Sequence, residues 1–384
     1  MRRGGKWKKT PIIGSSEIPV KIYYKPEDSD SEKIQLYIYK YPRIVFSEEE
    51  EKKSIVILVI GGIKSGKTNF INYFVNFLMK IKYKTNFRYV LDSNFDSNNE
   101  QLETKDINIY NIKSEDGKCY KIIDTPGLGN VDDFKEDKNI FDKIYNLFKE
   151  KIDSINAICF AMKNIYSFNY KEQYVFNTIL NLFGEELKNN FIIINTFCPP
   201  YEEPRNIYIF KEYYNMLIPE SEEPLFYQFN NVNLLLTSNN FTFEKKCWKM
   251  GYKNFHNIIQ KLEKFDKKYL YQSIEVINKI KNLDGIIDNL QEKLNNIKKS
   301  GDFKNGINEC LKSHDTISET INRLKTIALN KKFVLSNEYE LIFEWKLRNE
   351  DKKNLYDLRN LKNIKNLMID IYKNKKIDNL NKYM

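Results

Sequence analysis

Histidine and cysteine are scarce in this chain, which has two histidines and five cysteines among 384 residues. The cysteines form no CxxC pair, and their number is odd. This argues against a disulfide scaffold or a structural zinc site and fits a reducing compartment. With so few histidines, a histidine-based metal site or catalytic triad is also disfavoured.

Long apolar runs are missing as well. The longest strongly apolar run, Ile55–Ile60, is far shorter than the ~20 residues that cross a bilayer as a helix. The first residues, Met1–Lys6, are followed by no apolar run, so they do not predict a secretory signal. We therefore expect a cytoplasmic protein.

Charge is distributed unevenly along the chain. The 62 Lys and Arg residues outnumber the 52 Asp and Glu residues, which gives a net charge of +10. Residues 244–384 hold 30 of the basic and 19 of the acidic residues, so the excess lies in this part. Such an excess favours an acidic protein or an anionic membrane surface as a partner, and the second would make the protein a peripheral membrane protein. A solvated helical surface is the alternative. Nucleic acid ranks last, because no motif interleaves aromatic with basic residues.

The pattern of apolar residues divides the chain into three parts. Residues 1–50 include an alternating aromatic segment, Ile34–Phe46, and are interpreted as a loosely packed N-terminal extension with an accessory strand. Residues 51–245 alternate β-branched runs with helical periodicity, which predicts an α/β fold: a mostly parallel sheet with helices on both faces. Residues 246–384 are interpreted as an α-helical region.

Within residues 51–245, expected strands and helices follow one another along the chain. A turn signal, Ser114–Gly117, joins two of the strands and predicts a hairpin, which makes one edge strand of the sheet antiparallel. The expected strands are Ser54–Ile60, Asp106–Ile112, Tyr120–Ile123, Ile155–Met162, Phe191–Asn195 and Leu225–Phe229, and the expected helices include Thr68–Tyr83, Phe141–Phe148 and Tyr170–Leu182.

The C-terminal part carries heptad spacing. Apolar residues there step by four and three positions. They are Leu283, Ile287, Leu290, Leu294 and Ile297. These few heptads predict either a helical hairpin that packs on itself or an intermolecular coiled coil. A homodimer through these helices, or through the preceding domain, is therefore one expected assembly.

Residues 61–68 form a phosphate-binding loop signature. The string Gly61-Gly62-Ile63-Lys64-Ser65-Gly66-Lys67-Thr68 fits G-x-x-x-x-G-K-[ST], between a buried strand and an amphipathic helix. The glycines would let backbone N–H groups converge on phosphate oxygens at the positive end of the helix. Lys67 would reach the β- and γ-phosphates, and the Thr68 hydroxyl would bind Mg²⁺.

A second signal, Asp124-Thr125-Pro126-Gly127, closes the expected strand Tyr120–Ile123. In a nucleotide site, Asp124 would hold the shell of Mg²⁺. The Gly127 N–H would contact the γ-phosphate and release it after hydrolysis, which makes this loop a switch.

The phosphate-binding loop (P-loop), the hairpin and the string DTPGLG together resemble the translation-factor-related class of GTPases. Within it, the chain looks most like immunity-associated (IAN/GIMAP-type) and septin-like G domains. It looks closer still to eukaryotic proteins in which such a domain precedes coiled-coil helices. The resemblance covers roughly residues 50–300 and implies a P-loop NTPase G domain that binds GTP or GDP with Mg²⁺. The stretches that carry the resemblance are Gly61–Asn72, Ile122–Gly129, Asn190–Phe197, Phe229–Asn231 and Trp248–Gly251.

One motif departs from the class. The guanine-specificity motif is [NT]-K-x-D in the class and T-F-x-D in the close group, and it reads TFCP at residues 196–199 here, so Pro199 stands where a carboxylate is expected. The resemblance assigns Thr196 to this base loop and places Asn230 and Asn231 in the last loop on the base side. Guanine preference thus follows from the resemblance, and an ATPase that lost guanine selectivity is the alternative. Candidates to replace the carboxylate are Glu202 and Glu203.

Two residues of the expected switch bear on hydrolysis. Thr104 fits the Mg²⁺-binding switch threonine by its position before the hairpin, with Thr85 and Ser97 as competitors. Leu128 follows Gly127, where some GTPases carry a glutamine that orients the attacking water. We therefore expect intrinsic hydrolysis to be slow or to be completed by a partner subunit.

Lys64 departs from the close relatives, which have a small residue at this position. It is interpreted as a solvated lysine, with a cation near the phosphates as the alternative. The sequence thus predicts an Mg·GTP-dependent switch with slow or assembly-stimulated hydrolysis, in which Lys67 and Gly127 act on the phosphates. A nucleotide-bound scaffold that does not hydrolyse GTP is the remaining alternative.

Overall fold

The computed structural model describes residues 21–25, 34–91, 104–129, 134–165, 170–201, 203, 226–230 and 241–282, with the single residues 285, 289, 319, 320, 323, 326 and 327. The chain divides into two compact units, Met1–Ile274 and Glu275–Met384. The expected heptad positions 283–297 lie almost entirely outside the described residues, so the coiled coil stays a prediction.

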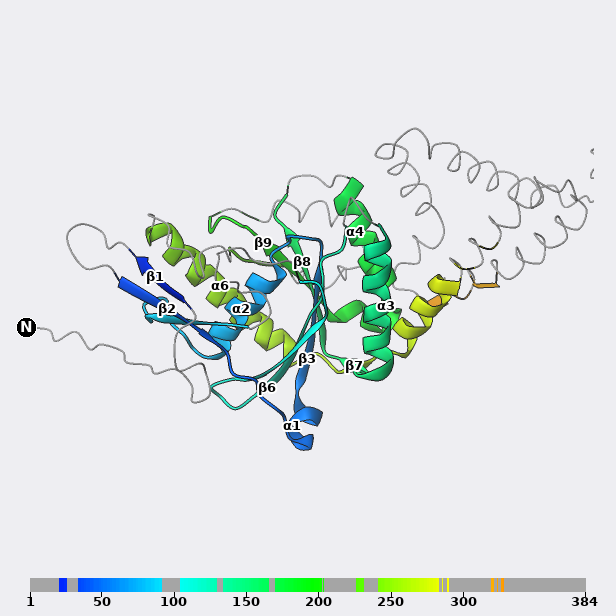
Figure 1. Ribbon diagram of the computed structural model, residues 1–384, viewed down its shortest axis with the longest axis horizontal. Coiled ribbons are helices and arrows are strands. Elements are labelled where there is room, and N and C mark those ends of the chain that lie inside the picture. Colours follow the sequence, from blue (N-terminus) through cyan, green and yellow to red (C-terminus); the bar gives the residue numbers. More distant parts are fainter. Residues whose placement is uncertain are drawn as a thin grey trace, which may run out of the picture. The chain divides into compact units, whose positions relative to one another are not determined.

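A six-stranded sheet forms the centre of the first unit (Figure 1). In spatial order it consists of β10 (Phe226–Gln228), β9 (Phe191–Thr196), β8 (Ala157–Lys163), β3 (Ile55–Gly61), β6 (Cys119–Asp124) and β5 (Asn108–Lys113). All neighbouring pairs are parallel except β5 with β6, which is antiparallel. The predicted fold class, a mostly parallel sheet with one antiparallel edge strand, is confirmed.

The central strand β3 is a β-branched run that is buried on both sides. Its register pairs Val59 with Asp124 of β6 and Gly61 with Ala161 of β8. The carboxyl ends of these strands therefore meet at one edge of the sheet, where ligands of open α/β sheets bind.

Helices cover both faces of the sheet, as predicted (Figure 1). They are α2 (Lys67–Leu78) and α6 (Phe241–Leu262) on one side, and α3 (Phe134–Glu150) and α4 (Tyr170–Asn181) on the other. On the first side, Phe70 of α2 and Phe255 of α6 have ring centroids 5.5 Å apart. On the second side, Phe160 of β8 contacts Phe176 of α4 at 5.4 Å.

Helix α6 belongs to the core of the first unit. Its residues Trp248, Phe255, Ile258 and Leu262 are buried in the same apolar cluster as α2 and the sheet. The sequence placed the start of the helical region at residue 246, within α6. In the structure α6 covers the sheet, because its aromatic residues pack against α2.

The N-terminal extension is more tightly packed than expected. A second sheet combines β1 (Lys21–Lys25), β2 (Ile34–Lys40) and β4 (Phe87–Val90), and β2 pairs in parallel with β4. The accessory strand is confirmed, but Ile38 is fully buried in the core cluster, so the expectation of loose packing is wrong for β2. The alternation of apolar residues over Ile34–Phe46 predicted strand β2. It could not predict that β2 pairs with β4, about 50 residues further along the chain.

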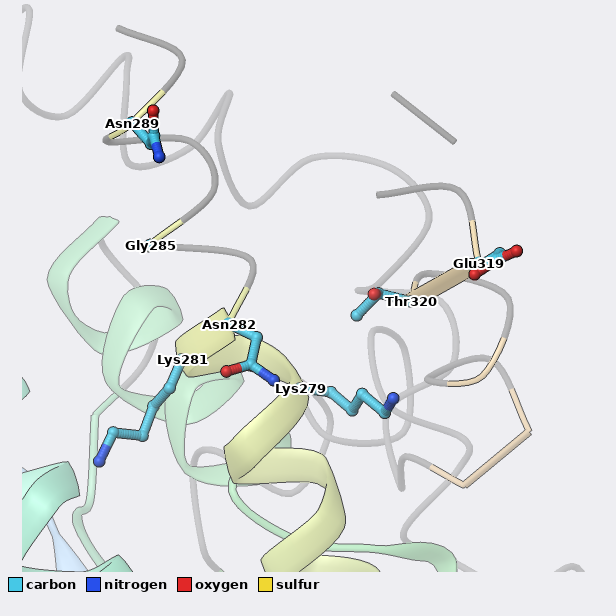
Figure 2. A pocket seen from close by; sticks show the side chains of 7 residues that line it. All are labelled: Lys279, Lys281, Asn282, Gly285, Asn289, Glu319 and Thr320. Carbon is cyan, nitrogen blue, oxygen red and sulfur yellow. The ribbon is translucent and has the colours of Figure 1, made fainter. Parts of the chain in front are cut away.

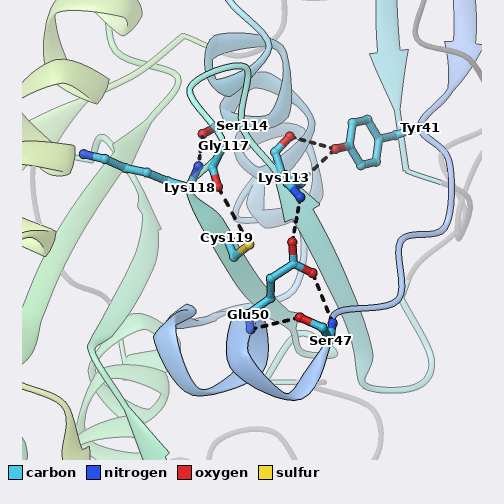
Figure 3. A network of polar contacts seen from close by, with 8 residues as sticks. All are labelled: Tyr41, Ser47, Glu50, Lys113, Ser114, Gly117, Lys118 and Cys119. Atoms are coloured by element: carbon cyan, nitrogen blue, oxygen red, sulfur yellow. Dashed lines mark hydrogen bonds and ion pairs between the residues drawn. The ribbon is translucent and has the colours of Figure 1, made fainter.

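A short helix, α1 (Glu48–Lys53), links this extension to β3. Ser47 and Glu50 form a capping box at its start (Figure 3). Glu50 also pairs with Lys113 Nζ of β5 at 2.6 Å, and the backbone of Lys113 bonds the Tyr41 hydroxyl (Figure 3). The extension is thus tied to the β5–β6 hairpin at two points.

The chain leaves the first unit through a short strand and a helix. The strand β11 (Lys268–Tyr269) pairs antiparallel with β7 (Ser154–Ile155), although residues 246–384 were expected to be helical. A helix then spans 271–282. Glu186, from the 3-10 helix η2 (Glu185–Asn190), accepts hydrogen bonds from the Ser273 backbone N–H at 2.9 Å and hydroxyl at 2.7 Å. Among the helices of the described part, none combines the length and hydropathy that a membrane span requires.

Candidate nucleotide-binding site

The P-loop lies between β3 and α2, as the sequence predicted. A Cβ on Gly61 would lie 2.1 Å from the Ala161 carbonyl oxygen, so this position next to β8 excludes any side chain. Gly66 caps α2 with φ +84°, which a glycine adopts without strain. Lys64, an exposed residue at the outer bend, has φ +58°. The loop therefore turns tightly into α2, and within it the Ser65 N–H donates to the Gly62 carbonyl oxygen at 3.2 Å.

Lys67 is the first residue of α2 and is almost fully buried. Its Nζ donates hydrogen bonds to the carbonyl oxygens of Gly61 at 3.2 Å and Gly62 at 3.0 Å. The ammonium group is thus held across the loop, at the N-terminus of a twelve-residue helix. Both the charge and the helix end attract phosphate.

The three expected Mg²⁺ residues come together beside Lys67. The Thr68 hydroxyl donates to Asp124 Oδ2 at 3.2 Å and lies 3.3 Å from the Thr104 hydroxyl oxygen. These residues come from α2, from the end of β6 and from the segment before β5. Of the competitors of Thr104, Thr85 bonds the Lys82 backbone N–H, and Ser97 lies outside the described residues.

The environment of Asp124 fits a bound cation. Its side chain is fully buried, and burial raises the pKa of its carboxyl group from 3.8 to about 6, although Lys67 and the Thr68 hydroxyl oppose this rise. Asp124 Oδ1 is buried without a hydrogen-bond partner. Hydroxyl and carboxylate oxygens are the hard ligands that Mg²⁺ prefers. The donor set therefore fits Mg²⁺, which Thr68, Thr104 and Asp124 would hold.

The DTPGLG loop lies directly on the P-loop. A Cβ on Gly127 would lie 2.6 Å from Ile63 Cα, so only glycine fits there. Leu128 is buried and bridges to the P-loop: its N–H donates to the Gly61 carbonyl at 3.1 Å, and its carbonyl accepts from the Ile63 N–H at 2.9 Å. The two phosphate-facing loops are therefore coupled through their backbones.

The end of this loop is tied to helix α3. The Gly129 N–H lies 3.0 Å from each carboxylate oxygen of Asp137, a buried residue in the first turns of α3. Sequence analysis missed Asp137, because a carboxylate eight residues after a glycine is no motif. The bond arises only because the loop folds back onto α3.

On the base side, the structure brings Thr196 to the P-loop. Its hydroxyl lies 2.7 Å from the Ser65 carbonyl oxygen and 3.0 Å from that of Met162, so it is engaged with the backbone. Asn230 follows β10, and its Oδ1 is buried without a partner. Pro199 is described at the expected carboxylate position, whereas Asn231 and Glu202 lie outside the described residues.

A hollow in the second unit holds none of these residues. It is lined by Lys279, Lys281, Asn282, Gly285, Asn289, Glu319 and Thr320, and the side chains of Lys279 and Lys281 run in opposite directions (Figure 2).

A central parallel sheet with one antiparallel edge strand, a P-loop at the carboxyl end of β3 and a DTPG loop bridged to it define a P-loop nucleotide-binding domain of the G-domain type. Residues 55–285 match the AIG1 family. The match spans more than half of the 384 residues, and the chain belongs to this family of GTP-binding G proteins. The predicted resemblance to immunity-associated G domains is confirmed. A comparison with curated proteins gave no match.

Two solved structures are similar in part. One is a bacterial selenocysteine-specific elongation factor, EF-Sec, with a TM-score of 0.33 and 17% identity, covering 55% of this chain and 29% of that chain. The other is Methanosarcina barkeri Roco2 RocCORdC bound to GDP, with a TM-score of 0.31 and 12% identity, covering 62% of this chain and 56% of that chain. This chain thus spans less than two thirds of the length of either.

Proposed function

We propose that this protein is a Mg²⁺-dependent GTP switch whose intrinsic hydrolysis is slow and is stimulated by a partner or by self-assembly. The observation that carries the proposal is the cluster of Thr68, Thr104 and Asp124 at the N-terminus of α2, in which the Thr68 hydroxyl oxygen lies 3.2 Å from Asp124 Oδ2 and 3.3 Å from the Thr104 hydroxyl oxygen. It joins the P-loop, the switch-threonine segment and the DTPG loop at one point.

The chain's own groups would act by charge and position. Lys67 would move from the carbonyls of Gly61 and Gly62 to the β- and γ-phosphates, while P-loop N–H groups and the end of α2 stabilise the developing negative charge. Mg²⁺, when bound, would neutralise charge on the phosphate oxygens. The proposal needs no protein nucleophile, because water attacks the phosphate.

The switch would work through two ties to the γ-phosphate, at Thr104 and at the Gly127 N–H. Loss of this phosphate would release both, and Leu128 and Asp137 would pass the change to the P-loop and α3. Slow hydrolysis is supported by Leu128, whose buried apolar side chain cannot orient water.

The helical region, residues 246–384, would be the output. The basic excess of residues 244–384 supports an acidic protein or an anionic membrane surface as the partner, in a cytoplasmic or peripheral membrane location. Homodimerisation through the G domain or the helices would supply the stimulation.

The proposal is tested by the nucleotide that the purified protein carries. The full chain, prepared without added nucleotide, is denatured and the released compounds are identified by ion-pair chromatography, beside Lys67→Ala. Bound GDP or GTP that the variant lacks supports the proposal. ADP or ATP would favour an ATPase, and no binding of Mg·GTP or Mg·ATP would refute a nucleotide switch.

Hydrolysis is measured separately. A single-turnover assay of the loaded protein, with and without a dimerising tag, separates the switch from a scaffold that does not hydrolyse GTP. We expect slow turnover alone and faster turnover on dimerisation. No turnover in either case would favour the scaffold.

A further inference from the structure

The solvent-facing side of α6 is basic. The helix contains five lysines, no arginine and one acidic residue, Glu244. Glu244 is buried, and its carboxylate accepts a hydrogen bond from the Tyr83 hydroxyl at 3.1 Å. The next acidic residue, Glu263, follows the end of the helix and pairs with Lys118. The exposed side of α6 therefore carries positive charge that no acidic residue of the helix offsets.

Three of the lysines form a row along the helix. Lys245, Lys249 and Lys253 are separated by four positions, which places them on one face, about 6 Å apart along the axis. All three are exposed. Within the part of the chain that the structure describes, no carboxylate pairs with any of them. No described neighbour thus neutralises the charge of this basic row.

The opposite side of α6 is committed to the core. Trp248, Phe255 and Ile258 are buried in the apolar cluster that includes α2. The ring centroid of Phe255 lies 5.5 Å from that of Phe70 in α2. The helix therefore has no free apolar face to insert between lipid tails, and a partner of the basic row is held mainly by charge.

The composition of this face fits a lipid surface. Several lysines on one helix face attract anionic headgroups, whereas bidentate recognition of nucleic-acid phosphates favours arginine. Peptide recognition uses a groove or a sheet edge, and the basic row lies on the outer side of a helix. Beside the row, Lys246 Nζ lies 4.3 Å from the ring centroid of Tyr201, which is 62% exposed. Exposed tyrosines are typical of protein surfaces that meet a membrane interface.

We propose that the basic row of α6, Lys245, Lys249 and Lys253, docks the first unit on the surface of an anionic lipid bilayer. The proposal rests on the proposed function, in which the helical region is the output, and it names both the partner and the surface that binds it. The attraction is electrostatic, so it grows with each lysine and is screened by salt. Because α6 packs on α2, which begins at Lys67, docking holds the nucleotide-binding domain at the bilayer.

The test is flotation of the full chain with two kinds of vesicle, phosphatidylcholine alone and phosphatidylcholine with about 30% phosphatidylserine. One variant combines Lys245→Gln, Lys249→Gln and Lys253→Gln, and a second has arginine at the same three positions. The matched control combines Lys52→Gln, Lys151→Gln and Lys188→Gln, which removes the same charge from exposed lysines outside α6. Glutamine has a helix propensity close to that of lysine, so the fold should be retained, and thermal melting checks this.

The unmodified protein should float with the anionic vesicles and not with phosphatidylcholine alone, and salt raised from about 0.05 M to about 0.5 M should release it. The glutamine variant of the basic row should bind about 100-fold more weakly, at the usual contribution of a lysine near an anionic leaflet. The arginine variant should bind like the parent, and the control variant within about threefold of it.

Three outcomes overturn the proposal. They are failure of the unmodified protein to float with anionic vesicles, equal losses in the two glutamine variants, and binding of random single-stranded RNA through the basic row without vesicle binding. Titration of the same preparations with Mg·GDP separates this proposal from the proposed function. Normal GDP binding without flotation refutes only the docking surface, whereas flotation through the basic row by a protein that binds no nucleotide refutes the switch and keeps the docking surface.

Discussion

Asp124 is a buried carboxylic acid, and its raised pKa means that its ionised form lowers the stability of the folded protein. The folded state binds a proton more tightly than the unfolded chain, because burial raises the pKa from 3.8 to about 6. The free energy of unfolding therefore falls as pH rises between these values and stays reduced above about 6. The rise corresponds to about 3 kcal/mol, at 1.36 kcal/mol per pKa unit.

Asp124→Asn should consequently stabilise the nucleotide-free protein at neutral pH by about 3 kcal/mol while abolishing Mg²⁺-dependent GTP binding. Urea unfolding at neutral pH and near pH 4 measures the first effect, and the gain should shrink at the lower pH. A variant that is less stable than the parent at both pH values would show that the carboxylate contributes stabilising bonds instead.

Gly127 has no room for a side chain, because a Cβ would lie 2.6 Å from Ile63 Cα. Gly127→Ala should push the DTPG loop off the P-loop and move its N–H away from the γ-phosphate. We expect affinity for a non-hydrolysable GTP analogue to fall at least about tenfold, the equivalent of one hydrogen bond to a charged group, while GDP affinity changes little.

Gly285→Ala is the control for this change, since nothing lies within 4 Å of its Cβ position. Equal losses for the GTP analogue and GDP in Gly127→Ala would mean that the substitution damages the P-loop as a whole, and the switch role of Gly127 would be withdrawn.

At the scale of elements, α2 and α6 approach each other closely at Gly251. A Cβ on Gly251 would lie 2.4 Å from Cε1 of Tyr73, whose hydroxyl donates to the Trp248 carbonyl at 2.7 Å. Gly251→Ala should destabilise the fold by about 1–3 kcal/mol through overpacking. Tyr73→Phe should cost about 1 kcal/mol for the lost hydrogen bond.

The double variant Gly251→Ala, Tyr73→Leu separates packing from helix propensity. If overpacking is the cause, removal of the ring makes room for the new methyl group, and denaturant unfolding should show a double loss smaller than the sum of the single losses. Additive losses would show that the effect of Gly251→Ala does not come from contact with the Tyr73 ring.

The helix 271–282 is capped at its start by Glu186, which accepts hydrogen bonds from the buried Ser273. Burial raises the pKa of Glu186 above its ordinary value of 4.5, against the opposing bonds from Ser273. The stability that depends on this group therefore falls as pH rises through its raised pKa. Glu186→Gln keeps an acceptor for Ser273, so we expect a flatter pH dependence of unfolding above pH 4.5 and no large loss of stability.

Glu48→Gln serves as the control, because Glu48 is exposed on α1. A steeper pH dependence in Glu186→Gln, or the same flattening in Glu48→Gln, would show that Glu186 is not the responsible group.

Local patterns predicted the elements of the G domain well, and long-range contacts explain the rest. The run before Gly61 predicted β3 because continuous β-branched residues suit a strand buried on both faces. The P-loop was readable because its function needs fixed residue types at fixed spacing. By contrast, Asp137, the Leu128 bridge and the parallel pairing of β2 with β4 depend on chain segments that meet only after folding.

Arg88 illustrates the same limit. It is buried in β4, donates to the carbonyls of Tyr83, Thr85 and Phe87, and lies 4.5 Å from the centroid of the Trp248 ring. From the sequence alone, an arginine is expected on the surface. Its contact with Trp248 of α6, 160 positions away, arises only after folding.

For the whole molecule, the division into two units predicts that nucleotide binding resides in the first. All described site residues, from Gly61 to Asn230, lie in the unit Met1–Ile274. A chain that ends after Asn282 should bind GDP within about threefold of the full chain, a difference below 1 kcal/mol. Loss of binding in a shortened chain that still melts cooperatively would show that the second unit completes the site.

The pairing of β11 with β7 anchors the chain at the point where it leaves the sheet. It is followed at once by the Leu270 N–H bond to the Asp153 carbonyl at 2.9 Å and by the Glu186 cap. Helix α3 starts near Asp137, which holds the switch loop, and ends at Glu150, just before β7. Asp137 and β7 thus lie toward opposite ends of α3, so a movement of α3 at its switch end would reach the β11–β7 pairing, which anchors the start of the helix 271–282.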